Sequence, residues 1–478
     1  MKEISENQVL AKMESANPWW SKVGDTAVFS VPFNELNKRR YFDVFSRLAS
    51  QRSPHRALIL MGPRRVGKTV LVFQLIRSLI ENGHEPDKLI YIDLQQPLYA
   101  GLGLEQLLQI ATHGLVENPP NVFVFFDEIQ YLKDWELHLK ALVDSFPNIK
   151  FVATGSAASA LKKKSAESGA GRFTDFLLPP LTFCEFLDLR GKSDLVEEVQ
   201  QEGRSQFDVT DIEKLNEHFL DYLNFGGYPE AVFSEEIQSD LARYIRNDII
   251  DKVLLKDLPS LYGIQDIQEL NSLFTTLAYN TANEVSLAAL SSKSGVAKNT
   301  IKKYIEYLES AFLIKVVHRI DNNAKRFVRA TSFKVYLTNP SIRSALFAPV
   351  TAEDQEMGDL VETAVFAQWF HSLNESLHYA RWKNGEVDIV KLDQTEKPLW
   401  IVEVKWSDRY EENPNDLKSL KSFCMKHPDC FAKVTTRTKR STKSLGEMEI
   451  DFMPASLYCY ILGSNIIKGK GRSAFATS

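Results

Sequence analysis

Apolar runs alternate with amphipathic segments through the first third of the chain. Residues 56–61 (RALILM) form a short apolar run typical of a buried parallel strand, and residues 70–83 then carry apolar side chains at helical spacing. Three more apolar runs follow, at residues 88–96, 121–135 and 150–161. This repeat of strand and helix predicts an α/β fold whose core is a parallel sheet.

The middle of the chain is mostly helical in pattern. Residues 185–275 have a helical periodicity that breaks at NFGGYPEAV, and we expect a helical lid there. Residues 283–317 contain two short helical patterns around Gly295 and then a strand, which predicts a winged helix-turn-helix. Its second helix would enter a DNA groove or lie across phosphates, although the same module also serves as a spacer between proteins. The residues that this helix would present are Lys298, Asn299, Thr300, Lys302 and Lys303.

Length and composition indicate several folded domains. With 478 residues, 44% hydrophobic and 25% charged, the chain is too long for one core and too apolar for extended disorder. No apolar run is long enough to cross a bilayer and no secretory signal is recognisable, so we expect a cytoplasmic protein with no membrane association. Four scattered cysteines indicate neither a disulfide framework nor a zinc site.

The net charge of −5 gives the chain no general attraction to nucleic acid. Contacts with DNA would therefore depend on local basic patches, such as residues 162–164 (KKK), residues 435–444 (TTRTKRSTKS) and the C-terminal tail. Each patch is also compatible with a solvated loop or tail.

The segment between the first strand and the first helix has the spacing of a phosphate-binding loop. Gly62 and Gly67 allow the backbone N–H groups to point at a polyphosphate, and the helix that follows presents its positive dipole end to the same charge. Lys68 would reach the β and γ phosphates, and Thr69 would place its hydroxyl on Mg²⁺. The expected nucleotide-binding residues are Gly62, Pro63, Arg64, Arg65, Val66, Gly67, Lys68 and Thr69.

Two further strands end in polar residues suited to the same nucleotide. Asp127 follows an apolar run and would lie at the carboxyl end of its strand, where it would hold Mg²⁺. Glu128 would orient the attacking water, which favours hydrolysis over storage of ATP; the alternative is a surface carboxylate at a helix start. Thr154 ends the next strand, in VATGSAAS, and would sense the γ phosphate.

These segments together resemble a known family. GPRRVGKT, FFDEIQYLKDW, VATGSAAS, GAGRFTDFLLPPLTFCEFL and NFGGYPEAV occur in the order seen in prokaryotic AAA-type P-loop ATPases that carry a C-terminal domain of unknown function. The resemblance implies a core of the additional-strand type, and a catalytic arginine finger at Arg172 acting on a neighbouring subunit. A finger would require a homo-oligomer, for instance a ring; the alternative is an exposed residue flanking a strand.

The last third contains a second set of charged residues. Glu362 lies on an amphipathic helix pattern, Asp388 on a strand after a turn, and Glu403 and Lys405 two apart on the next strand, so that three carboxylates and a lysine can converge. Carboxylates bind Mg²⁺ or Mn²⁺, and the lysine would be catalytic, acting on the attacked phosphate. The set resembles a PD-(D/E)XK nuclease; an exposed hairpin with alternating charges, or an intact fold without activity, are the alternatives.

The expected organisation has five parts: an N-terminal extension (1–30), a P-loop ATPase core (31–184), a helical lid (185–275), a winged helix-turn-helix (276–330) and an α/β PD-(D/E)XK nuclease-like domain (331–478). The expected function is an ATPase that acts on DNA and couples turnover to a metal-dependent nuclease-like module, in repair, recombination or defence. The alternative is an ATP-driven switch that does not cut, and whose C-terminal part binds DNA or a protein.

Overall fold

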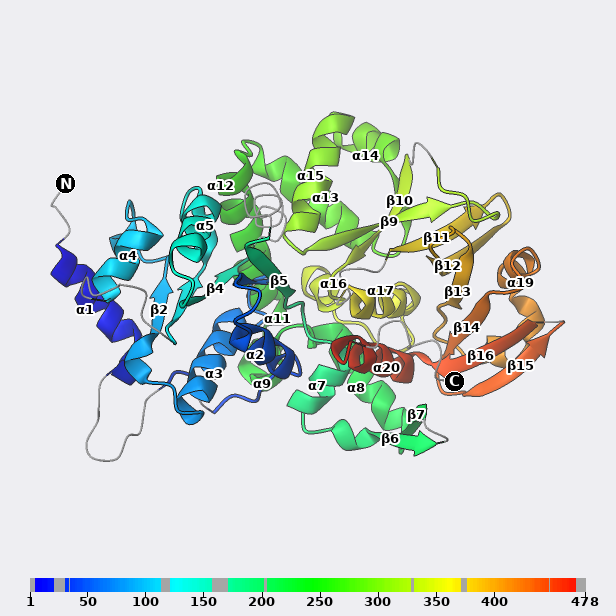
Figure 1. Ribbon diagram of the computed structural model, residues 1–478. Helices are drawn as coiled ribbons and strands as arrows, with labels where there is room; N and C mark the ends of the chain where they lie inside the picture. The colour runs from blue at the N-terminus through cyan, green and yellow to red at the C-terminus, as the bar shows by residue number, and fades with distance from the viewer. Residues whose placement is uncertain are drawn as a thin grey trace. The chain divides into compact units, whose positions relative to one another are not determined.

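The computed structural model describes residues 5–20, 31–33, 35–112, 121–156, 171–201, 204–327, 331–370, 376–446 and 448–469. The chain divides into two compact units, Met1–Leu178 and Pro179–Ser478. Figure 1 labels the elements of both units. No helix in the described part of the chain is long and apolar enough to cross a membrane.

The N-terminal unit is built on a five-stranded parallel sheet, which confirms the expected α/β class with a parallel core. The strand order is β2-β3-β4-β1-β5, so β4 is inserted between β1 and β3. The strands are β1 (Ala57–Met61), β2 (Leu89–Asp93), β3 (Phe123–Asp127), β4 (Lys150–Gly155) and β5 (Phe173–Leu177). The main helices are α1 (Glu6–Ala16), α2 (Phe42–Ser50), α3 (Lys68–Glu81), α4 (Leu104–Ala111) and α5 (Trp135–Ser145).

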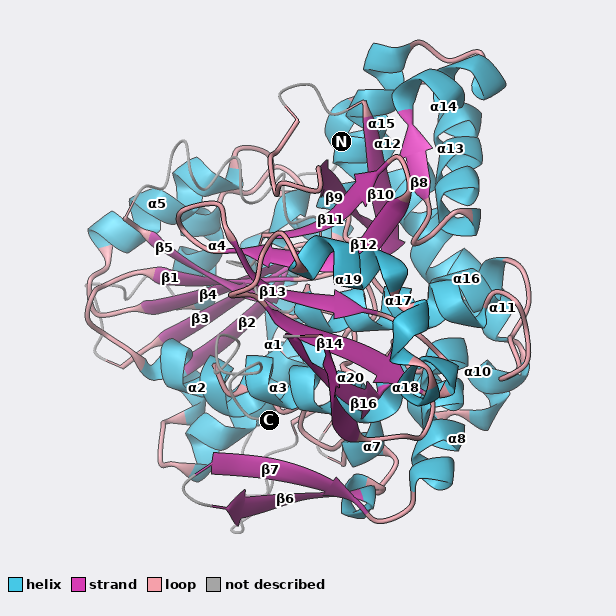
Figure 2. Cartoon of the chain, turned by 90° about the vertical axis from the view of Figure 1, so that its right-hand side faces the viewer, coloured by secondary structure: helices cyan, strands magenta, loops and turns pink. Residues whose placement is uncertain are grey.

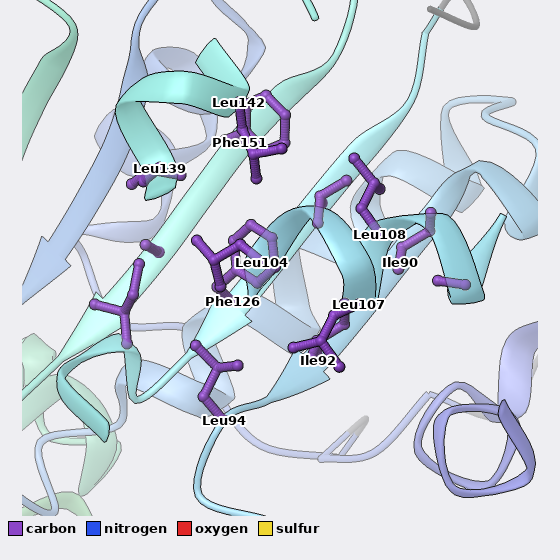
Figure 3. Packing of buried hydrophobic residues seen from close by; sticks show 14 of the residues in the cluster. Ile90, Ile92, Leu94, Leu104, Leu107, Leu108, Phe126, Leu139, Leu142 and Phe151 are labelled. Carbon is purple, nitrogen blue, oxygen red and sulfur yellow. The ribbon is translucent and has the colours of Figure 1, made fainter. Parts of the chain in front are cut away.

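Both faces of the parallel sheet are packed. Strands β1 and β3 are buried at every residue, as their uninterrupted apolar runs predict. On one face, Phe126 and Phe151 of the strands pack with Leu104 and Leu107 of α4 and with Leu139 of α5 (Figure 3). Each such side chain contributes about 1.5–3 kcal/mol when fully buried, so the strand ends that carry the polar residues have little freedom to move.

The C-terminal unit contains a nine-stranded mixed sheet in the order β15-β16-β14-β13-β12-β11-β9-β10-β8, drawn as magenta arrows in Figure 2. The strands are β8 (Glu284–Ser286), β9 (Ile314–Ile320), β10 (Ser332–Leu337), β11 (Leu377–Trp382), β12 (Gly385–Leu392), β13 (Pro398–Glu403), β14 (Phe431–Thr436), β15 (Ser441–Leu445) and β16 (Met448–Pro454). Helix α17 (Met357–Trp369) packs on β10 and on α20 (Ala455–Ile467), and α19 (Lys418–Cys424) packs on β12.

The predicted helical lid is part of this second unit, and it is not helical throughout. A β-hairpin of β6 (Val196–Gln201) and β7 (Arg204–Val209) lies between α7 (Phe183–Leu189) and α8 (Ile212–Phe225). The sequence did not reveal the hairpin because its strands, VEEVQQ and RSQFDV, carry few apolar residues. The remaining elements are α9 (Pro229–Phe233), α10 (Glu235–Ser239), α11 (Leu241–Tyr244), the π-helical η6 (Ile245–Ile250) and η7 (Lys252–Asp257), α12 (Leu258–Tyr262) and α13 (Ile267–Tyr279).

The predicted turn in NFGGYPEAV is present, and close packing explains one of its glycines. Helix α8 ends at Phe225 and α9 begins at Pro229. A Cβ on Gly227 would lie 1.9 Å from the side-chain nitrogen of Asn339, so only glycine fits there. Gln368 of α17 donates to the Tyr222 hydroxyl of α8 at 2.9 Å, which joins the predicted lid to the predicted nuclease-like segment.

The segment predicted as a winged helix-turn-helix folds into α14 (Leu287–Ser294), a left-handed turn at Gly295 and α15 (Lys298–Ser310), followed by β9. Its strands are continuous with the large sheet, because β10 pairs with both β8 and β9, and β9 pairs with β11. The expected boundary at 330/331 therefore separates two paired strands. Residues Lys298, Asn299, Lys302 and Lys303 of α15 are exposed, and Thr300 is half-buried.

Candidate functional site

The loop between β1 and α3 has the conformation that its glycines predict. Gly67 has φ +93°, and α3 begins at the next residue, so the unpaired N–H groups of the first turn face the loop. A Cβ on Gly62 would lie 2.1 Å from the carbonyl oxygen of Leu178, which leaves room for glycine alone. Pro63 and Val66 are buried, whereas Arg65 is exposed. This cradle at a helix N-terminus fits a polyphosphate.

Lys68 is bound inside the loop. Its side chain is buried, and Nζ donates to the carbonyl oxygens of Gly62 at 3.0 Å and Pro63 at 2.8 Å. Neutral carbonyls are weaker partners for an ammonium group than phosphate oxygens are. The lysine is therefore positioned to exchange these carbonyls for a phosphate.

Asp127 is the centre of a hydroxyl cluster at the carboxyl edge of the sheet. Thr69 donates to its Oδ2 at 2.8 Å, Tyr91 donates to the same oxygen at 2.7 Å, and Thr154 donates to Oδ1. Burial, and then the charge of Glu128, raise the pKa of Asp127, while the three hydroxyl donors act in the opposite direction. The carboxylate and the Thr69 hydroxyl are hard oxygen ligands, which fit Mg²⁺ bound to a phosphate chain.

Glu128 is held in an unusual backbone conformation beside this cluster. Its φ is +54°, a left-handed value that is uncommon for a residue with a side chain, and its N–H donates to the Thr154 hydroxyl at 3.0 Å. Gln130 donates from Nε2 to the Glu128 carboxylate, and to Ser156 Oγ at 3.1 Å. Residues from the ends of β3 and β4 are thus joined at one point, and strain of this kind is typical of functional sites.

Three residues that sequence reasoning did not single out support this site. Tyr91 of β2 reaches Asp127, and its backbone N–H and carbonyl are paired with the side chain of Asn17 at 2.7 and 2.9 Å. Arg39 is buried and donates from Nη1 to the Val66 carbonyl at 3.0 Å, which fixes the loop from outside. Tyr91 lies in an apolar strand pattern that indicates only core, and no pattern marks Arg39.

Arg64 and Arg172 differ in their distance from this site. Arg64 donates to the Tyr131 hydroxyl at 3.4 Å, next to the loop. The Arg172 carbonyl accepts from the N–H of Ala57 at the start of β1, so Arg172 lies at the opposite edge of the sheet from the loop that follows β1. It forms an ion pair with Asp144 at 2.5 Å. Arg172 cannot reach the phosphates of its own subunit, and its action on a neighbour stays a prediction.

Two expected basic contacts have different outcomes. Residues 162–164 lie outside the described part of the chain. The loop expected at residues 435–444 contains the end of β14 and most of β15, and three of its basic side chains are already ion-paired. The pairs are Arg437 with Glu353 at 3.8 Å, Arg440 with Asp208 at 3.5 Å and Lys443 with Glu411 at 2.8 Å.

The acidic residues of the last third do converge. Asp388 on β12 and Glu403 on the antiparallel β13 are buried, and Lys405 Nζ contacts Glu403 Oε1 at 2.8 Å and Asp388 Oδ2 at 3.5 Å. The backbone N–H of Val404 donates to Asp388 Oδ2 at 2.8 Å. Glu362 on α17 is also buried beside them.

A second lysine, which the sequence analysis missed, lies among these carboxylates. Lys334 on β10 is 3% exposed, and its Nζ lies 2.9 Å from Glu362 Oε1, 2.7 Å from Glu386 Oε1 and 3.9 Å from Asp388 Oδ1. Tyr336, on the same strand, donates to Glu362 Oε1 at 2.6 Å. The signal of Lys334 in the sequence is weak, because this lysine stands in the apolar run SFKVYL, which indicates only a buried strand.

The predicted metal set of Glu362, Asp388 and Glu403 does not fit this arrangement. Within the described ranges, no group of three or more His, Cys, Asp or Glu side chains is placed to hold a metal ion. The physical reason is that two ammonium groups, those of Lys334 and Lys405, lie between the carboxylates where a divalent ion would have to lie. A metal ion would have to displace a buried, paired charge to enter.

Burial and mutual charge set the protonation of this cluster. Burial, followed by the interactions with Asp388, raises the pKa of Glu403 to about 7, and burial likewise raises the pKa of Glu362 to about 7. Burial acts to lower the pKa of Lys334 and Lys405, but the surrounding carboxylates outweigh it and hold both above the ordinary value. Both lysines are therefore charged at neutral pH.

Family models match three consecutive parts of the chain, and none of them covers half of it. Residues 54–187 match an AAA domain, and residues 216–354 and 357–458 match two domains of unknown function, DUF8612 and DUF4143. The loop between β1 and α3, Asp127 and Thr154 all lie within the part of the chain that is similar to an AAA domain. Neither of the two C-terminal models names a nuclease or a DNA-binding module.

Relatives and solved structures add likeness without assigning an activity. An uncharacterised protein of Methanocaldococcus jannaschii is 26% identical over 73% of this chain and 75% of its own, and one of Haemophilus influenzae is 26% identical over 60% and 68%. The ORC2 protein of Aeropyrum pernix in its ADP form is 15% identical over 62% of this chain and 92% of its own, with a TM-score of 0.33. DnaA of Aquifex aeolicus bound to AMPPCP is 12% identical over 56% and 86%, with a TM-score of 0.27.

Proposed function

We propose that this chain is an AAA-type ATPase that binds and hydrolyses ATP with Mg²⁺. The observation that carries the proposal is the meeting of Lys68, Thr69, Asp127, Glu128 and Thr154 at one edge of the sheet. Each of these residues has the chemistry that one part of phosphoryl transfer to water requires. The match of residues 54–187 to an AAA domain supports the same conclusion.

Each residue has a separate task in this proposal. Bound Mg²⁺ supplies the positive charge that neutralises the phosphate oxygens. Thr69 and Asp127 would hold that ion, and the three hydroxyls that donate to Asp127 keep its carboxylate in one orientation. Lys68 would leave the carbonyls of Gly62 and Pro63 for the phosphate oxygens. These groups are positioned before ATP arrives, so little reorganisation is needed when it binds.

Glu128 is the residue proposed to position the attacking water and accept its proton. Its carboxylate accepts a hydrogen bond from Gln130, which also donates to Ser156, directly after the end of β4 and two residues after Thr154. If Gln130 released the Glu128 carboxylate, that carboxylate could bind the attacking water. A γ phosphate bound near Thr154 and Ser156 would favour this release. Hydrolysis would thus be linked to the positions of two strand ends.

The second part of the proposal is that turnover serves a DNA-directed C-terminal unit. The exposed set at the start of α15, with Lys298, Lys302 and Lys303, supports contact with phosphates. A homo-oligomer is proposed as well, because Arg172 cannot serve its own site.

One observation favours the ATP-driven switch, in which the C-terminal unit does not cut DNA, over the nuclease. The convergence of Asp388, Glu403 and Lys405 supports a nuclease-like site, but Lys334 places a further ammonium among the carboxylates. In this non-cutting form, the nucleotide state would change how tightly the C-terminal unit binds DNA or a protein. The nuclease form requires the same site to take up Mg²⁺ or Mn²⁺.

The ATPase is tested by measuring phosphate release from ATP by wild-type protein and by Lys68→Ala. Wild type should hydrolyse ATP with Mg²⁺ and Lys68→Ala should not, because the variant cannot neutralise the phosphates; equal rates would refute the site. The DNA-directed part is tested with linear, single-stranded and branched DNA, with and without ATP. Mobility shifts without cutting support the switch, and cutting with Mg²⁺ or Mn²⁺ supports the nuclease. A protein that neither shifts nor cuts any of these DNAs would refute action on DNA.

A further inference from the structure

The buried acidic cluster of the C-terminal unit has a cation supplied by the protein itself. Glu362, Asp388 and Glu403 are each less than 9% exposed, and the charges that balance them are Lys334 and Lys405. Isolated buried charges are strongly unfavourable, so a cluster of three carboxyl groups requires bound metal, paired cations or protonation of some of its members. The structure contains the second solution.

Lys334 has the contacts of a central cation. Its Nζ lies within 4.0 Å of three carboxylates, from Glu362, Glu386 and Asp388, which come from one helix and one strand. An ammonium has three donors, and two of these distances, 2.9 and 2.7 Å, are those of charge-assisted hydrogen bonds. The side chain is 3% exposed, so the contacts are protected from water and salt.

One carboxylate oxygen of the cluster lacks a partner. Glu403 Oε1 contacts Lys405 at 2.8 Å, whereas Glu403 Oε2 is buried and has no hydrogen-bond partner among the residues that the structure describes. A buried acceptor without a donor is unfavourable, and it is available to any cation that enters the cluster. The carboxylate oxygens are therefore of the kind that binds a divalent ion, but the positive charge of Lys334 opposes the entry of such an ion.

We propose that Lys334 is a built-in substitute for a divalent ion, and that it keeps the Glu362–Asp388–Glu403 cluster free of metal. This role of Lys334 does not depend on ATP turnover. It would explain why the C-terminal unit binds DNA or a protein without cutting DNA. Lys334 comes from β10, which pairs with β8 and β9 of the helix-turn-helix segment. The cation is therefore supplied by the part of the sheet adjoining α14 and α15, not by the hairpin that carries Asp388.

The test measures the uptake of Mn²⁺ by the protein in the absence of nucleotide. Uptake is detected as a loss of the free-ion signal in electron paramagnetic resonance. The full-length wild type should take up no Mn²⁺ at this cluster. Lys334→Met should gain one ion, at least about tenfold more tightly than wild type, because Glu362 then loses the ammonium that pairs with it and Asp388 keeps Lys405 alone. Combining Lys334→Met with Asp388→Asn should abolish the gain, which assigns the ion to this cluster.

The thermal midpoint of unfolding gives a second readout. Lys334→Met should unfold at a lower temperature than wild type and regain part of the loss with Mn²⁺, which should not stabilise wild type. Lys433→Met is the matched control, because Lys433 is equally buried and ion-paired to Asp451 in the same sheet. This control should lose stability without any rescue by Mn²⁺. Lys334→Gln, nearly the same size, serves if the methionine variant does not fold.

Two outcomes would overturn the inference. The first is Mn²⁺ uptake by wild type that Asp388→Asn abolishes, which would mean that Lys334 does not keep metal out. The second is a folded Lys334→Met or Lys334→Gln protein that takes up no more Mn²⁺ than wild type. Neither result bears on ATP hydrolysis, so failure of this inference and failure of the proposed ATPase are separable.

Discussion

Replacing Tyr91 by Phe isolates one hydrogen bond at the proposed magnesium site. The Tyr91 hydroxyl donates to Asp127 Oδ2 at 2.7 Å, and the ring packs on Phe73 with centroids 4.7 Å apart. The substitution removes the hydroxyl and keeps the ring contact. Asp127 retains its donors Thr69 and Thr154, so the carboxylate should remain in place.

The size of the effect follows from the charge of the acceptor. A hydrogen bond to a charged group is worth about 1.5–3 kcal/mol, and one pKa unit corresponds to about 1.4 kcal/mol. The Tyr91 hydroxyl acts to lower the pKa of Asp127, so its loss should raise that pKa further. Asp127 must be ionised to hold Mg²⁺, and a higher pKa means that it is protonated at a higher pH.

The assay is kcat/KM for ATP with saturating Mg²⁺, measured from acid to neutral pH. The acid limb of the Tyr91→Phe profile should move to higher pH, with smaller loss of activity at alkaline pH. Tyr99→Phe, which removes a buried tyrosine hydroxyl elsewhere in the same unit, should leave the profile unchanged. An unshifted acid limb in Tyr91→Phe would refute the role assigned to this hydrogen bond.

Three further predictions test other parts of the account. Gly62→Ala should weaken ATP binding by about tenfold or more in calorimetry, because the added Cβ would lie 2.1 Å from the Leu178 carbonyl oxygen; unchanged affinity would contradict the loop geometry. Mixing Arg172→Ala with Lys68→Ala should restore some ATP hydrolysis if Arg172 acts across a subunit interface, and no rescue in oligomers shown to be mixed would exclude that role. Glu403→Gln should gain stability relative to wild type as pH rises from about 4.5 to about 7. Burial raises the pKa of Glu403 to about 7 in the folded protein, so in this range the carboxyl ionises in the unfolded chain first and wild type loses stability; equal slopes of thermal midpoint against pH would contradict this.

The convergence of the residues of the proposed nucleotide site could be predicted, because it follows from local pattern and one general rule. Gly62 and Lys68 are fixed by loop spacing, and Asp127 and Thr154 each end an apolar strand. Carboxyl ends of parallel strands meet at one edge of a sheet, so these ends had to be neighbours once β3 and β4 were adjacent. Tyr91 could not be found in this way, because its position in the apolar strand β2 indicates only core packing.

The C-terminal cluster was predictable only in part. Asp388 and Glu403 lie on consecutive strands whose antiparallel pairing brings them together, and Lys405 follows two residues after the end of β13. The alternation of side chains along a strand is visible in sequence. Lys334 reaches the cluster from β10, which is separated from β12 by β9 and β11 in the sheet. Helix α17, which carries Glu362, packs on β10. Strand order of this kind depends on long-range contacts and cannot be read from local periodicity.

The fate of ATP bound to Glu128→Gln tests whether this site hydrolyses ATP through Glu128. This variant keeps the loop, Lys68 and Asp127 but lacks the carboxylate proposed to orient the water. In the presence of Mg²⁺ it should bind ATP as wild type does, and retain it unhydrolysed, with a turnover rate lower by a factor on the order of 100 or more. Hydrolysis by Glu128→Gln at the wild-type rate would contradict the assignment of Glu128 as the catalytic carboxylate of this site.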